Sequence, residues 1–210
     1  MPLVHGSIDD APAWAYRGFV GRATPPACVA THERDELLVI VGCARHVWDD
    51  LNHIPPSAHL MAVNHIGLYL HHVDHWASLH ADMAVLFNQA RFLEGCEWAK
   101  QTAIHARAHY TNLHEAPQAF IWEFSDEHSR TSGLFATLVG LCLGYQHVLL
   151  AGIPMDNSGN FHGPWDGSGW KHSNEHERAQ WVRWRLNNPE FARCVRSLSG
   201  WTRDLLGDTF

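Results

Sequence analysis

Residues 131–155 read TSGLFATLVGLCLGYQHVLLAGIPM, an almost uncharged run with the length of a membrane span. A polar Gly-Tyr-Gln-His at 144–147 interrupts it, whereas a spanning helix needs about 20 consecutive apolar residues. Thr131 or Ser132 is a good N-cap, so the first half predicts a helix that is apolar on all its faces. HVLLAG then predicts a strand. We therefore prefer a buried helix followed by a buried central strand to a membrane segment.

Short apolar runs alternate with helical patterns along the rest of the chain. ELLVIVG (36–42), HLMAVN (59–64), VDHWASLH (73–80) and QAFIWEF (118–124) predict strands. CARHVWDDLNHI, ADMAVLFNQARFLEG and HERAQWVRWRLNN predict helices, TAIHARAH fits either state, and CVRSLSGWTRDLLG predicts a short strand and a small helix. This alternation predicts an α/β, Rossmann-like fold with a mostly parallel sheet and helices on both faces.

The domain organisation follows from length and local composition. A chain of 210 residues suits one domain. Residues 1–34 show weak periodicity and are expected to form an irregular N-terminal arm, and 35–210 a single α/β domain. Residues 156–174 form a long Gly/Ser/Asn loop, and because such loops in compact domains are usually functional or disordered, we expect a lid.

Composition narrows the class of protein. The formal net charge of −7 argues against broad affinity for nucleic acid or anionic membranes. The five cysteines form no CxxC pair, and the chain opens without a basic, apolar leader, which together predict reduced thiols in the cytoplasm. The 18 histidines are spread over nearly the whole chain, which favours a compositional habit over a metal site. The 10 tryptophans include several at 165–184 that could pack a lid or a partner subunit of a homo-oligomer.

Ligands of open α/β sheets bind outside the carboxyl ends of the strands, so the residues that follow each predicted strand are site candidates. After the strands these are Gly42, Cys43, Ala44, Asn64, His80, Gly152 and Asp156, and the residues before the buried helix, Arg130, Thr131, Ser132 and Gly133, are added to them. Gly42 at a strand-to-helix turn would admit a phosphate, but a tight turn that needs glycine explains it equally well. Ser132-Gly133 is likewise either a plain helix start or an anion site.

Several familiar chemistries lack their motifs. There is no GxSxG, no HEXXH and no Asp-x-Asp of the kind that holds a divalent metal for many sugar-nucleotide transferases. His105 and His109 stand four residues apart and would chelate a metal if that segment were helical. We expect neither a metal nor another cofactor.

The ordered set of TSG, an apolar helix, LGY, an apolar strand and GI resembles the bacterial sialyltransferases of glycosyltransferase family 42 and related phage-type proteins. The similarity runs in order over roughly 36–185, with VIVGCARHVWDDL in place of the family's GxGPS-type turn. It implies a Rossmann-like, GT-A-like fold, a CMP-sugar donor, no metal and a histidine general base. If the gene belongs to a phage, the cytoplasm that the cysteines predict is that of the host cell.

The resemblance assigns roles residue by residue. Asn64 looks like the family's nucleotide-contacting asparagine, His80 stands where the family carries asparagine, and Ser132 matches the serine at the buried helix start. His172 in the His-Ser pair matches the catalytic base. By spacing, Asp156 and His162 replace two tyrosines that hold the leaving phosphate; an aspartate would repel that phosphate and a histidine could protonate it.

These features predict a metal-independent glycosyltransferase that uses a nucleotide-activated sugar, with His172 and His162 as its catalytic residues. The acceptor is open between a glycan, a lipid head group and a modified nucleobase in DNA. One alternative is a nucleotide- or sugar-binding protein of the same fold without turnover. The other is a metal-dependent hydrolase built on the histidine clusters at 71–80 and 105–114.

Overall fold

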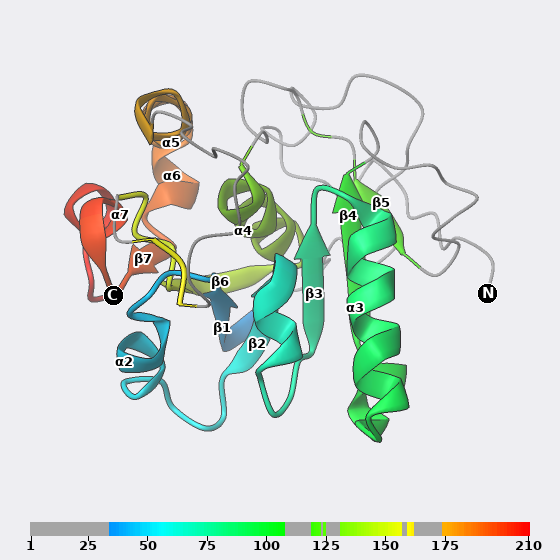
Figure 1. Cartoon of the computed structure of the whole chain (residues 1–210). Helices are drawn as coiled ribbons and strands as arrows, with labels where there is room; N and C mark the ends of the chain where they lie inside the picture. Colours follow the sequence, from blue (N-terminus) through cyan, green and yellow to red (C-terminus); the bar gives the residue numbers. More distant parts are fainter. Residues whose placement is uncertain (1–33, 108–118, 123, 125–130, 157–158, 162–173) are drawn as a thin grey trace.

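The computed structural model describes residues 34–107, 119–122, 124, 131–156, 159–161 and 174–210. Seven strands form one sheet in the order β5-β4-β3-β2-β1-β6-β7, and every neighbouring pair is parallel. The strands are β1 (Arg34–Val41), β2 (His59–Val63), β3 (His75–Ser78), β4 (Ala103–Arg107), β5 (Phe120–Trp122), β6 (Tyr145–Ala151) and β7 (Val195–Ser197). Helices cover both faces, which confirms the α/β, Rossmann-like prediction (Figure 1).

The order of the strands contains one reversal. From β1 the sheet grows through β2, β3, β4 and β5 in one direction, and the chain then returns to place β6 and β7 on the other side of β1. In doubly wound sheets, ligands bind outside the carboxyl ends of the strands at such a reversal. The carboxyl ends of β1 and β6 are therefore where a site is expected, and the 131–155 stretch supplies one of these two strands.

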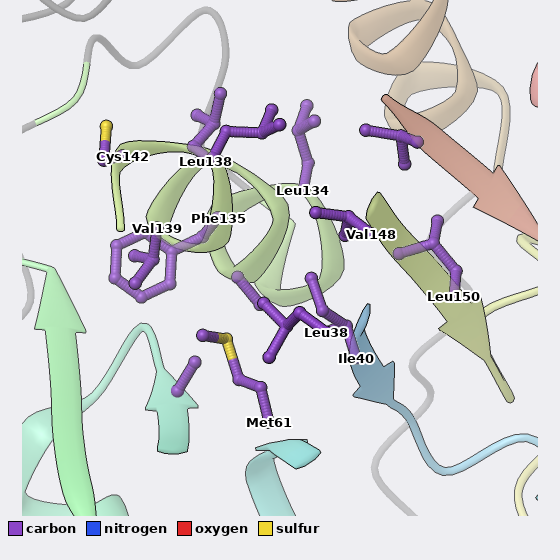
Figure 2. Close-up of a cluster of buried hydrophobic side chains, with 14 of the residues drawn as sticks. Leu38, Ile40, Met61, Leu134, Phe135, Leu138, Val139, Cys142, Val148 and Leu150 are labelled. Carbon is purple, nitrogen blue, oxygen red and sulfur yellow. The ribbon is translucent and has the colours of Figure 1, made fainter. Parts of the chain in front are cut away.

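Helix α4 (Ser132–Cys142) forms the centre of the larger core. Every residue from Leu134 to Cys142 is buried, and the helix packs on β1, β2 and β6 through side chains such as Leu38, Ile40 and Val148 (Figure 2). The strand half of the stretch is β6, as predicted. No helix in the described part of the chain is long and apolar enough to cross a bilayer.

The opposite face of the sheet is covered by α2 (Val47–Leu51), η2 (Asn64–Leu68), α3 (Ala81–Leu93) and η3 (Glu97–Lys100). Trp76 of β3 is fully buried there and stacks on Phe87 of α3 with ring centroids 6.2 Å apart. Its indole Nε1 donates a hydrogen bond of 2.7 Å to the backbone oxygen of Asn64. The core of this face thus also holds the segment that follows β2.

The C-terminal part adds α5 (Asn174–Asn187), α6 (Pro189–Ala192) and α7 (Gly200–Leu206) beside β6 and β7 (Figure 1). Trp181 and Trp184 of α5 are fully buried and meet at nearly a right angle, with centroids 5.9 Å apart. Their rings belong to the core of the chain itself. These two tryptophans are thus not available to a lid or a partner subunit.

Other predictions need correction or lie outside the described residues. His105 lies in strand β4, so the helix that a metal-chelating pair with His109 would require does not form at His105. His109 itself, the expected arm up to residue 33, and residues 157–158 and 162–173 of the expected lid are outside the described part.

Candidate functional site

The carboxyl ends of β1 and β6 are joined directly by backbone contacts. The Gly42 amide donates to Ala151 O at 2.8 Å, and the Ala44 amide donates to Gly152 O at 3.1 Å. A Cβ atom on Gly42 would lie 2.5 Å from Gly152 O and 2.6 Å from Ile153 Cγ1. Close approach of the two strands is therefore a sufficient reason for glycine at position 42. An anion at this turn would take its hydrogen bonds from other groups.

Gly152 closes this junction from the β6 side. Its φ of +63° lies in the left-handed region, and a Cβ atom there would stand 2.6 Å from Val47 Cγ2. Its amide donates to Asp50 Oδ2 at 2.7 Å, and the same oxygen accepts the hydroxyl of Ser199 at 2.7 Å. The buried carboxylate of Asp50 thus ties α2, the end of β6 and the start of α7 together. The sequence does not single out this residue, because Asp50 differs from its neighbour Asp49 only in the burial of its side chain.

Cys43 follows Gly42 and is half-buried. Its thiol donates to Val63 O at 3.8 Å, and burial raises its pKa to about 11. Because the thiolate is the nucleophilic form of cysteine, this side chain stays protonated and unreactive near neutral pH. The candidate thiol is a packing contact between the ends of β1 and β2.

Asn64 has an unusual backbone at the end of β2. Its φ of +57° is left-handed, and within the described residues the one other non-glycine with this property is Met155, which follows β6. Such residues are uncommon outside glycine and cluster at functional sites. Both lie next to the carboxyl ends of strands that flank β1. The position predicted to contact a nucleotide is therefore also a conformational outlier.

The start of α4 meets the same edge of the sheet. Thr131 is the N-cap, and its hydroxyl accepts the Leu134 amide at 3.2 Å, which resolves the choice between Thr131 and Ser132. Ser132, the first helical residue, is partly exposed. A Cβ on Gly133 would lie 2.9 Å from Ile153 Cγ2, so that glycine lets α4 pack against the segment after β6.

His80 and Asp156 occupy the periphery of this group. His80 is exposed, lies just before α3, and its amide donates to Ser78 Oγ at 3.1 Å. It follows β3, which is two strands from β1, or about 10 Å at the usual strand spacing. A carboxylate oxygen of Asp156 lies 2.7 Å from where a Cβ of Gly200 would be. The aspartate thus faces the start of α7.

A second charged residue at this edge also escaped sequence reasoning. Arg107, the last residue of β4, is 2% exposed, and its Nη2 donates to Phe124 O at 3.4 Å. Arg107 pairs with Trp122, which belongs to the core on the α4 face of the sheet, so its side chain lies on that face. The sequence Ala-Ile-His-Ala-Arg of this strand gives no local signal that the cation is buried.

The described residues thus bring Gly42, Cys43, Ala44, Asn64 and Gly152 together on three adjacent strands, with Thr131, Ser132 and Gly133 at the helix start beside them. Arg130, His162 and His172 lie outside the described residues. Among described histidine, cysteine, aspartate and glutamate side chains, no group of three or more is arranged to hold a metal ion.

Solved structures share this fold. The sialyltransferase CstII from Campylobacter jejuni, in complex with a substrate analogue, cytidine-5'-monophosphate, matches with a TM-score of 0.55 and 14% identity over 84% of this chain and 86% of that chain. A structure of the same enzyme with CMP-3FNeuAc matches with a TM-score of 0.54 and 13% identity, covering 84% and 89%. No protein-family model and no curated protein matches the chain. At this level of identity the likeness establishes that the chain has the same α/β fold as these sialyltransferases.

Proposed function

We propose that the protein is a metal-independent glycosyltransferase that moves a sugar from a CMP-sugar-like donor to a hydroxyl acceptor. The observation that carries this proposal is the shared fold with an enzyme whose structures hold CMP and CMP-3FNeuAc. The outlier Asn64 and the partly exposed start of α4 lie at the strand ends where a fold of this type binds ligands. A donor nucleotide suits this edge.

The described residues would hold the donor through neutral hydrogen bonds. The Asn64 side chain would contact the nucleotide or the sugar, and Ser132 would present its hydroxyl at the first turn of α4. The N-terminus of an 11-residue helix favours a neighbouring phosphate. Asp156, whose carboxylate faces Gly200, would serve as part of the loop beside the start of α7.

The chemistry rests on two histidines that the resemblance nominates. His172 would take the proton from the acceptor hydroxyl as the acceptor oxygen forms its bond to the anomeric carbon. The bond between that carbon and the phosphate oxygen breaks, and CMP leaves with the electron pair. His162 would hydrogen-bond or protonate the departing phosphate. An imidazole suits both tasks, because its unperturbed pKa of about 6.5 is close to neutrality.

The direct test measures release of CMP from CMP-N-acetylneuraminic acid in the presence of EDTA, with and without an acceptor. Wild-type protein is expected to release CMP, and His172→Ala to lose about 10²- to 10⁴-fold in rate, the usual contribution of a positioned acid or base. His147→Ala, an exposed position on β6, serves as the matched control and should keep the wild-type rate. Full activity in His172→Ala would contradict the assignment of the base.

A binding protein without turnover is the second candidate. It is favoured by the amides of Gly42 and Ala44, which donate within the chain, and by Asp156 in place of a phosphate-holding tyrosine. A nucleotide that binds in calorimetry but is not consumed with any acceptor would support it.

The compartment is inferred from the cysteines. Cys43, Cys96 and Cys194 are free thiols in the described part of the chain, as expected for the cytoplasm, or the host cytoplasm if a phage encodes the protein. Fractionation of the native cell, with the protein recovered in the cytoplasm, is the outcome this inference requires.

A further inference from the structure

Three aromatic side chains from distant parts of the sequence meet on the surface beside the candidate site. Trp48 of α2 lies 5.3 Å from Phe161, and Tyr69, which follows η2, lies 5.0 Å from the same ring, measured between centroids. Both rings stand nearly perpendicular to Phe161, at 72° and 88°. Trp48 remains 41% exposed and Tyr69 53% exposed. We call these three residues the aromatic platform.

The platform is fixed to the carboxyl ends of β1 and β2. The Phe161 amide donates to Cys43 O at 3.0 Å, and Asn160 forms an antiparallel bridge with Ala44. Tyr69 ends the short η2 turn that Asn64 begins, and its amide donates to Ile66 O at 2.9 Å. The backbone that carries the candidate donor residues therefore also carries the platform.

Ordinary core packing does not account for these rings. The rings of a core aromatic residue are buried on both faces. Trp48 and Tyr69 instead leave about half of their surface in water, and each contacts the ring of Phe161. Exposed apolar side chains that gather in this way mark a binding surface more often than those scattered singly. The position beside the carboxyl ends of β1 and β2, where ligands of α/β sheets bind, makes a small-molecule or glycan ligand the natural occupant.

The surrounding groups select the class of ligand. Asp49 and Asn160 are exposed and adjoin Trp48 and Phe161 in sequence, and the exposed Arg45 lies three residues before Trp48, so groups of both charge signs lie close to the platform residues along the chain. A sugar ring presents weakly positive C–H groups to the negative face of an aromatic ring and hydroxyls to polar side chains at its rim. A polyanion is disfavoured by Asp49 and by the formal net charge of −7.

We propose that Trp48, Tyr69 and Phe161 form the binding platform for a neutral glycan, which is the acceptor of the transfer. The assignment of the glycan as acceptor rests on the proposed function; the binding of the glycan itself does not. This choice favours a glycan over the lipid head group and modified nucleobase that the sequence leaves open.

The test is a glycan array of defined neutral and charged oligosaccharides, followed by titration of the best neutral glycan against wild-type protein and variants. Trp48→Ala and Tyr69→Ala are each expected to weaken the affinity tenfold or more, and Trp48→Phe to recover part of it because an aromatic face remains. Phe92→Ala is the matched control, since Phe92 is an aromatic residue with the same 41% exposure on α3. It should bind as the wild type does.

Release of CMP from the donor without acceptor is measured in parallel, because it reports the donor site alone. Unchanged hydrolysis in Trp48→Ala with loss of glycan binding supports the platform as an acceptor site. Glycan binding through Trp48 by a protein that consumes no donor supports the platform and overturns the proposed function. Absence of glycan binding by the wild type, preference for a nucleobase or an anionic ligand, or equal affinity in Trp48→Ala overturns the platform.

Discussion

His105 is a fully buried imidazole with hydrogen bonds of fixed direction. Trp122 Nε1, which can only donate, lies 3.0 Å from His105 Nδ1, so the neutral ring carries its proton on Nε2 and donates to His75 Nδ1 at 3.1 Å. His75 Nε2 then lies 3.2 Å from the Tyr145 hydroxyl, which lies 2.7 Å from His59 Nδ1. This series of hydrogen-bonded side chains, from Trp122 to His59, crosses the sheet away from the candidate site and holds the strands in register.

Burial, with a smaller effect of the neighbouring His75, lowers the pKa of His105 well below its usual value. In the unfolded chain the His105 imidazole binds a proton near pH 6.5, whereas in the folded chain it stays neutral to lower pH. The free energy of unfolding is therefore highest above pH 6.5 and decreases as the pH falls below it. From pH 7.5 to 5.5 this one group should lower the free energy of unfolding by about 1 kcal/mol. The side chain of His105→Gln can still accept and donate hydrogen bonds. In denaturant unfolding, the free energy of unfolding of this variant should fall by about that much less than that of the wild type over the same pH interval. His53→Gln, an exposed control, should retain the wild-type difference; an unchanged slope in His105→Gln would refute this explanation.

Some residues of the candidate site could be predicted from the sequence, and others could not. Gly42, Asn64 and Gly152 could be nominated because each follows a recognisable strand, and strand ends are where α/β sheets bind ligands. Asp50 and Arg107 could not, because their importance depends on burial and on partners 102 and 17 residues away in sequence. Neither charge stands in a local pattern that indicates its environment.

At the scale of the elements, the junction of β1 with β6 is the feature that most constrains the site. Gly42 and Gly152 allow the two backbones to touch, and the carboxylate of Asp50 accepts a hydrogen bond from the Gly152 amide. The loop after β6 is held in turn by α5, because Arg178 Nε donates to Met155 O at 2.7 Å and its guanidinium lies 5.2 Å from the Trp201 ring. The candidate site thus rests on elements from both halves of the chain.

Gly152→Ala tests that junction. The substitution combines a left-handed φ, which costs an L-residue about 1–2 kcal/mol, with a Cβ that would stand 2.6 Å from Val47 Cγ2. Overpacking of this kind adds about 1–3 kcal/mol. Gly95→Ala is the control, since Gly95 has a φ of +88° and no heavy atom within 4 Å of an added Cβ. Urea unfolding should show a larger loss for Gly152→Ala; equal losses would mean that the junction can relax.

Most elements could be predicted from their patterns. The 131–155 stretch yields a helix and a strand because its apolar runs are long and its Thr-Ser-Gly and Gly-Tyr breaks are strong signals. Strand β4 could not be assigned, because Ala, His and Arg have no marked preference for strands and its pattern is too short to decide. Its state is set by pairing with β3 and β5, which lie elsewhere in the sequence.

At the scale of the whole molecule, seven parallel strands with one reversal give a single edge at which a ligand can meet several strands at once (Figure 1). Parallel pairing and helices on both faces follow from the alternation of strand and helix patterns. The order of the strands does not, because it depends on long-range contacts that no local pattern encodes. The fold of CstII is shared at 14% identity, so strand pairing and packing of this kind can be formed by sequences that differ at most positions.

The central claim is that the strand ends around Asn64 and Ser132 bind a cytidine nucleotide, and calorimetric titration with CMP, UMP and GMP tests it most directly. We expect one CMP site per chain. Asn64→Gly, which permits the φ of +57° but removes the amide, and Ser132→Ala should each weaken binding about two- to tenfold, the effect of one neutral hydrogen bond. Ser57→Ala, an exposed serine away from this edge, should leave the affinity unchanged. Failure of all three nucleotides to bind, or CMP binding that is indifferent to both variants, would contradict the account.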